Sequence, residues 1–138
     1  MELELNYQDG QTPIDFDEKV GLLIKSVTTQ GELDELEQLN IEKAVEWIFN
    51  TNLNQKIILT EKFIKQLHYK MFSDIWKWAG VFRKSEKNIG VIWVNIATEL
   101  RILLDDTKFW IDNKTHEPDE IAIRFKLRLV NIHCFPNG

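Results

Sequence analysis

The sequence predicts a mainly α-helical bundle that carries one small β-hairpin. Apolar residues recur at three- and four-residue steps in four segments between residues 32 and 133, as one buried helix face requires. Between residues 81 and 93 this period gives way to two short β-prone runs. Hydrophobic residues make up 43% of the 138 residues, which is enough for a folded core.

Residues 1–25 are expected to form an irregular N-terminal arm, and residues 26–138 the helical domain. Asp9-Gly10 and Thr12-Pro13 are turn signals inside the arm. The apolar piece from Val20 to Ile24 fits either a short strand or one helical turn.

The first long helix is expected to begin near Glu32 and to end in the polar residues 50–55. Thr29 to Glu32 has the form of a capping box. The second helix should follow Thr60 as its N-cap and run towards residue 75. The predicted buried faces are Leu33, Leu36, Leu39 or Asn40, Ala44 and Ile48 in the first helix, and Phe63, Ile64, Leu67, Met71 and Ile75 in the second.

Residues 81–83 and 89–93 flank the polar residues 84–88, which is the pattern of a hairpin. A third helix is expected over residues 96–111, and a fourth from residues 117–120 to His133, where Pro136-Asn137-Gly138 forces a turn. Their predicted inward residues are Leu100, Leu103, Leu104, Phe109 or Trp110, Ile121, Phe125, Leu129 and Ile132.

The net charge of −5 argues against nucleic-acid binding, because phosphate neutralisation needs a dominant Lys/Arg surface. The Arg83-Lys84 pair could still meet a small anion. Cys134 is the only cysteine, so no intrachain disulfide can form and a reducing cytoplasm is expected. No apolar run approaches the roughly 20 residues of a membrane-spanning helix, so we expect a soluble protein without membrane contact.

The residue types that can take part in catalysis or anion binding are concentrated at residues 133–138. A histidine can act as a base near neutral pH, and an Asn-Gly turn can aim backbone N–H groups at an anion. This combination indicates phosphoryl or nucleotidyl chemistry. On residue types alone a plainer interpretation is favoured, in which His133 is a helix-terminal side chain and the turn is an ordinary one. His68 is expected to make an interhelical contact, and Cys134 to be a small buried side chain.

The stretch resembles the opening of the Fic signature, with matches at His133, Phe135 and Gly138. Upstream, Trp78-Ala79-Gly80-x-x-Arg83 resembles the segment that leads into the family's hairpin flap, and Ile89-Gly90 falls where the flap would be. The chain is therefore identified as a suspected member of the Fic/Doc family over about residues 26–138. Together with Gly31-Glu32-Leu33, the same blocks are similar to the branch called mobile mystery protein B.

The resemblance implies a fold and a reaction. In this family AMP moves from ATP to a Ser, Thr or Tyr hydroxyl of a target protein. Carried over, His133 is the general base and Phe135 anchors the loop, while Asn137 and Gly138 bind phosphate. Ile89, Gly90 and Val91 would line up a target segment as an added strand, although a purely structural hairpin is an equal alternative.

Two departures matter. Asn137 stands where the family has Asp or Glu to hold Mg²⁺, so metal affinity should fall. The second half of the signature is missing from the 138 residues, so the motif is truncated and this form is expected to be inactive.

The resemblance also indicates autoinhibition, because Thr28 and Glu32 fit most of an inhibitory helix motif. The capping box explains Glu32 equally well. Two alternatives to AMP transfer remain open: phosphoryl or other nucleotide transfer on the same scaffold, and a catalytically weak toxin–antitoxin-type binding protein. A homo-oligomer is possible.

Overall fold

The computed structural model describes residues 3–6 and 14–137, and this part of the chain is built from helices. The turn signals at Asp9-Gly10 and Thr12-Pro13 lie outside the described residues. The elements in chain order are α1 (Phe16–Lys19), α2 (Gln30–Asn50), α3 (Gln55–Ile58), α4 (Glu61–Phe72), η1 (Trp93–Asn95), α5 (Ile96–Asp112) and α6 (Pro118–Ile132).

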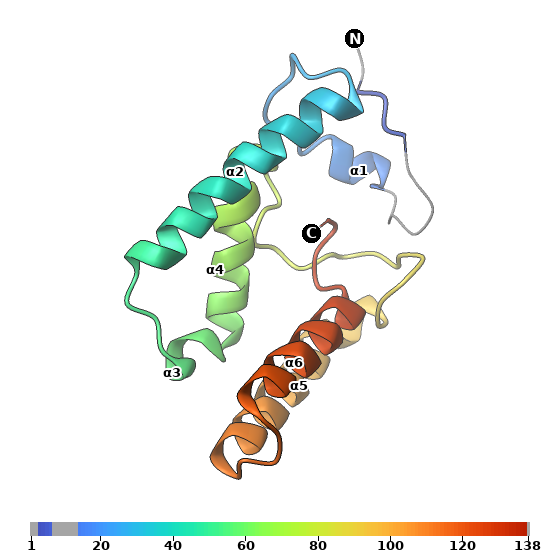
Figure 1. Cartoon of the computed structure of the whole chain (residues 1–138). Helices are drawn as coiled ribbons and strands as arrows, with labels where there is room; N and C mark the ends of the chain where they lie inside the picture. Colours follow the sequence, from blue (N-terminus) through green and yellow to red (C-terminus); the bar gives the residue numbers. More distant parts are fainter. Residues whose placement is uncertain (1–2, 7–13, 138) are drawn as a thin grey trace.

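The long helices form two pairs, α2 with α4 and α5 with α6 (Figure 1). The short α3 lies in the connection of the first pair, and the chain between α4 and α5 crosses from one pair to the other. The end of the chain returns into the space between the pairs (Figure 1). Residues 134–137 can therefore contact segments from both halves of the sequence.

Side chains cap the helices as the sequence predicts. The Thr29 hydroxyl oxygen accepts from the Glu32 N–H at 3.3 Å, and the Thr60 hydroxyl oxygen accepts from the Phe63 N–H at 3.1 Å. Each bond satisfies one of the N–H groups that the first helical turn leaves without an intrahelical partner. Pro118 opens α6 because its missing N–H costs nothing at that position.

Two clusters of buried side chains make up the core. The first cluster joins α4, α5 and the end of α6 and contains Leu59, Phe63, Ile64, Ile96, Leu100, Leu103, Leu104, Ile132, Cys134 and Phe135. The second cluster joins the N-terminal segment, α2 and the chain after α4 and contains Leu3, Leu22, Val27, Leu33, Phe72, Ile75, Trp76 and Ala79. The first cluster thus includes two residues of the C-terminal turn.

The predicted buried faces of the helices are confirmed. The structure also decides the two positions where the sequence left a choice between neighbouring residues. In α2 the buried residue is Asn40, while Leu39 is 56% exposed. Asn40 can be buried because its amide donates to the Lys70 carbonyl at 3.1 Å and accepts from the Asp74 N–H at 2.9 Å. In α5 the inward residue is Trp110, whereas Phe109 is exposed.

The predicted hairpin is not confirmed, because residues 81–93 form no β-ladder within the described chain. Their backbone groups pair with the end of α6 instead. The Arg83 N–H donates to the Cys134 carbonyl at 2.9 Å, and the Val91 N–H donates to the Ile132 carbonyl at 3.3 Å. The β-prone runs therefore mark extended backbone, but each run has a partner elsewhere in the chain.

The N-terminal arm is not wholly irregular. It contains α1, and Leu22 forms an isolated antiparallel bridge with Trp76. Two backbone hydrogen bonds of 2.8 Å, from Leu23 to Ile75 and from Lys77 to Gly21, flank this bridge. Among the described residues, no helix combines the length and the apolar character that crossing a membrane would require.

Candidate functional site

The C-terminal end of α6 is the starting point of the candidate site. His133 follows the last helical residue with φ 54° and ψ 66°, a left-handed conformation that is uncommon for a residue with a side chain. Its N–H donates to the Val130 carbonyl at 3.1 Å, which closes the helix. The chain then leaves the helix axis through residues 134–137, here called the motif turn.

Arg83 holds this helix end in place. The guanidinium is 2% exposed and donates from Nε to the His133 carbonyl at 2.5 Å. Its other donors reach the carbonyls of Ser85 at 2.9 Å, of Ile132 at 3.3 Å and of Val91. A positive charge is favourable here, because the carbonyls at a helix C-terminus carry partial negative charge. The predicted role of Arg83 in meeting a small anion is wrong, since the side chain is buried and occupied.

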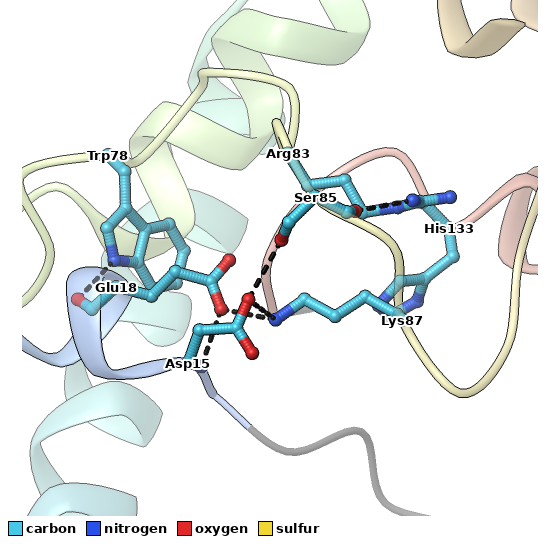
Figure 2. Close-up of polar contacts among 7 residues, drawn as sticks. All are labelled: Asp15, Glu18, Trp78, Arg83, Ser85, Lys87 and His133. Carbon is cyan, nitrogen blue, oxygen red and sulfur yellow. Dashed lines mark hydrogen bonds and ion pairs between the residues drawn. The ribbon is translucent and has the colours of Figure 1, made fainter. Parts of the chain in front are cut away.

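The His133 imidazole is half-buried beside Lys87 and Arg83 (Figure 2). Its Nε2 is buried and has no hydrogen-bond partner among the described residues. Burial lowers the pKa of His133 below 6.5, and the positive charges of Arg83 and Lys87 lower it further. The ring is therefore a neutral imidazole at neutral pH.

The loop of residues 84–92 packs directly on His133 through Gly90. Gly90 has φ 99°, and a Cβ atom there would lie 2.8 Å from the His133 Cβ and 3.0 Å from the Ile132 carbonyl oxygen. Only glycine fits this approach without displacing the helix end.

The three predicted target-binding residues differ in what they offer. Ile89 is 47% exposed, whereas Gly90 packs on His133. Both backbone polar groups of Val91 are used within the chain, the N–H by Ile132 and the carbonyl by Arg83. A target strand could thus pair with Val91 only after these bonds break, and the target-binding role of the three residues stays a prediction.

The N-terminal arm is tied onto the same loop (Figure 2). The Lys87 ammonium, whose side chain is 2% exposed, forms an ion pair with Glu18 and another with Asp15 at 3.5 Å. Ser85 donates its hydroxyl to Asp15 at 2.8 Å, and Trp78 donates its indole N–H to the Glu18 carbonyl at 2.9 Å. The sequence did not predict this contact, because Asp15 and Glu18 lie about 70 positions from the loop and leave no local spacing signal.

The motif turn is anchored by Phe135. Its ring is buried and stacks on the His68 ring, with centroids 3.7 Å apart and an angle of 14° between the planes. The neighbouring Cys134 is also buried, and burial raises the pKa of its thiol to about 12. Cys134 is thus the small buried side chain that the sequence predicts.

Asn137 is held at two points. Its backbone carbonyl accepts from His68 Nε2 at 2.7 Å, and its side-chain amide donates to Glu37 at 3.3 Å. Glu37 also accepts from the Trp76 indole at 2.7 Å, and burial raises the pKa of this carboxyl. His68 was predicted to make an interhelical contact, but it joins α4 to the motif turn. Gly138 lies outside the described residues.

The same residues bear on the predicted Mg²⁺ site. Asn137 supplies a neutral amide oxygen, and the neighbouring Glu37 carboxylate is already bonded to Trp76 and to the Asn137 amide. The part of the chain that the structure describes contains no group of three His, Cys, Asp or Glu residues arranged for a metal. Mg²⁺ favours several hard oxygen ligands, so these residues do not form its site by themselves.

Glu32 caps α2. Its carboxylate accepts from the Thr28 N–H at 3.2 Å, while its own N–H donates to the Thr29 hydroxyl. The Thr29 half of the predicted capping box is thus present, whereas the Glu32 carboxylate reaches the N–H of Thr28 and not that of the N-cap Thr29. An inhibitory role of Thr28 and Glu32 stays a prediction.

Comparison with known proteins shows which family the chain resembles. A family model described as Fic/DOC family matches residues 58–138, more than half of the chain. The match contains α4 to α6, the 84–92 loop and the motif turn. No curated protein and no solved structure gives a significant match, so the resemblance to a particular branch stays a prediction. The chain belongs to the Fic/DOC family.

Proposed function

We propose that the protein transfers AMP from ATP to a hydroxyl side chain of a target protein, with His133 as general base. Membership of the Fic/DOC family supports a nucleotidyl transferase. The observation that carries the assignment to His133 is its Nε2, which is buried and lacks a hydrogen-bond partner among the described residues. Buried polar atoms in folded proteins are rarely left without a partner unless a ligand or a reaction requires them.

In the proposed step, the imidazole accepts the proton of a Ser, Thr or Tyr hydroxyl. The hydroxyl oxygen attacks the α-phosphorus of ATP, the bond from that phosphorus to the bridging oxygen breaks, and pyrophosphate leaves. The ring must be neutral to accept a proton, and burial together with Arg83 and Lys87 favours this form. ATP enters as its Mg²⁺ complex, so the metal is treated as part of the substrate.

The target hydroxyl must also gain access to Nε2 of His133. Because Nε2 is covered, a hydroxyl can reach it only after a covering segment moves. We assign this movement to the 84–92 loop, which packs on His133 at Gly90 and is tied by Lys87 to the N-terminal arm. Ordering a target segment along this loop would couple target binding to exposure of the base.

The test uses the purified full-length protein. It is incubated with candidate target proteins and ATP labelled on either the α- or the γ-phosphate. We expect label in protein from the α position only, with loss of transfer in His133→Ala and full transfer in the matched control His116→Ala, which changes a histidine at the α5–α6 turn.

Label from the γ position would replace the proposal with phosphoryl transfer. Absence of label from both positions would favour the third alternative, a toxin–antitoxin-type binding protein. Equal transfer by the parent and His133→Ala would remove His133 from the reaction.

A further inference from the structure

His68 is a buried histidine whose two ring nitrogens are both engaged. It lies on α4 with 4% of its surface exposed. Its Nδ1 accepts from the Gly80 N–H at 2.9 Å, and its Nε2 lies 2.7 Å from the Asn137 carbonyl oxygen. Since the Gly80 N–H can only donate and the carbonyl can only accept, the proton must be on Nε2. The surroundings thus select one neutral tautomer.

The bond to Gly80 fixes the ring from one side. Gly80 has φ 78°, and a Cβ atom there would lie 2.9 Å from the Lys65 carbonyl oxygen, so this turn sits tightly on α4. A donor held by such close packing leaves the imidazole little freedom to rotate or to change tautomer.

Ring contacts fix the plane of the imidazole. The Phe135 ring stacks on it with the centroids 3.7 Å apart, and the centroid of Phe72, one helical turn further along α4, lies 4.8 Å away. These rings also exclude water, and burial lowers the pKa of His68 to about 4. The imidazole therefore stays an uncharged donor at neutral pH.

The donor acts on the residue that begins the proposed phosphate-binding loop. A hydrogen bond to the Asn137 carbonyl restrains the backbone at the end of the motif turn. Glu37 restrains the Asn137 side chain independently, at 3.3 Å.

We propose that His68 is a positioning residue that orients the motif turn for phosphate binding, by donating from Nε2 to the Asn137 carbonyl. The effect on nucleotide binding rests on the proposed function, whereas the effect on the turn does not. A merely structural histidine would stabilise the fold through its ring packing alone. The experiment must therefore separate the effect of the Nε2 hydrogen bond from the effect of ring packing.

Two substitutions separate the donor from the ring. His68→Gln places an amide N–H near the Nε2 position and keeps a donor for Asn137. His68→Asn places its amide near the Nδ1 position and keeps only an acceptor for Gly80. Both variants lose the stacking ring and differ in which of the two hydrogen bonds they keep, so a difference measured at Asn137 reports the Nε2 donor.

The first readout is NMR of the 138-residue chain, which needs no nucleotide. We expect ¹⁵N shifts of a neutral Nε2–H tautomer for His68, and a backbone order parameter at Asn137 that falls in His68→Asn but stays near the parent value in His68→Gln. Equal order parameters in the two variants, or an Nδ1–H tautomer in the parent, would overturn the proposal. Melting temperatures show whether both variants fold.

The second readout is the dissociation constant of the full-length protein for ATP. We expect His68→Asn to bind roughly tenfold more weakly than His68→Gln, which is the size of one lost hydrogen bond. His116→Gln serves as the control with parent-like affinity. Equal weakening in both His68 variants would overturn the link to phosphate. If the parent does not bind ATP, the proposed function fails, and the NMR comparison still decides the role of His68 in the turn.

Discussion

The Arg83 guanidinium donates to the backbone carbonyl of His133 at 2.5 Å, at the residue where α6 turns into a left-handed conformation. The two residues are 50 positions apart in the chain. One cation thereby satisfies the last carbonyls of α6 and also holds the 84–92 loop through Ser85 and Val91. The orientation of the histidine and the position of the loop thus depend on the same side chain.

Arg83→Lys should destabilise the protein although it keeps the charge. A lysine ammonium cannot reach four carbonyls in a fixed fork, so a loss of about 2–4 kcal/mol in unfolding free energy is expected. Denaturant titration measures it. Arg124→Lys is the matched control, because Arg124 is half-exposed and pairs with Glu120 on the surface of α6, where changes stay within about 0.5 kcal/mol. Equal effects of the two changes would contradict the role assigned to Arg83.

The pH dependence of transfer should report His133. Only the neutral ring accepts a proton, so kcat/KM should fall as the pH drops through the pKa, and this acidic limb should lie below 6.5. Lys87→Gln removes one positive charge and should move the acidic limb of the profile to higher pH, whereas Lys87→Arg should leave it at the same pH. A limb above 6.5 in the parent would contradict the environment described for this ring.

His68 should make stability pH-dependent. Its pKa is about 4 in the folded chain against 6.5 ordinarily, so the unfolded chain takes up the proton first as the pH falls. The stabilisation is fully present above pH 6.5 and is lost towards pH 4, with about 2 kcal/mol disappearing between pH 7 and pH 5. Urea titrations at both pH values should show a smaller difference for His68→Gln than for the parent. An unchanged difference would contradict the pKa shift.

Gly90→Ala should disturb the site more than the fold. The added methyl group would lie 2.8 Å from the His133 Cβ, and alanine would have to adopt a left-handed backbone with φ 99°. Together these two effects should lower the free energy of unfolding by about 1–3 kcal/mol. The His133 ring signals should shift in NMR spectra, and AMP transfer should fall. Gly31→Ala is the matched control, since nothing lies within 4 Å of its Cβ position near the start of α2. Parent-like His133 signals in Gly90→Ala would show that the loop does not press on the histidine.

The helices could be predicted because their information is local. Thr29, Thr60 and Pro118 mark the starts of α2, α4 and α6, and the three-to-four spacing of apolar residues identifies the buried faces. The choice between Leu39 and Asn40 could not be made from period alone, because both positions fit the three-to-four spacing of the buried face. It depends on the Lys70 carbonyl, which belongs to α4, and on the Asp74 N–H, two residues after that helix ends.

The site was harder to predict, because its polar contacts are made between distant segments. His68 meets Asn137 across 69 positions, and Glu18 meets Lys87 across the same separation. Neither pair leaves a periodic or spacing signal in a single sequence. The hairpin was predicted wrongly for the same reason. The Val91 N–H finds its acceptor on Ile132, beyond the reach of any local strand pattern.

The buried thiol of Cys134 has a practical consequence. It is the only cysteine in the 138 residues, it directly follows His133, and its raised pKa keeps it unreactive while the chain stays closed around it. The rate at which a maleimide labels this sulfur would therefore measure how often the end of α6 opens. The same sulfur would reveal whether a bound nucleotide or target slows that opening, without a reporter group being introduced.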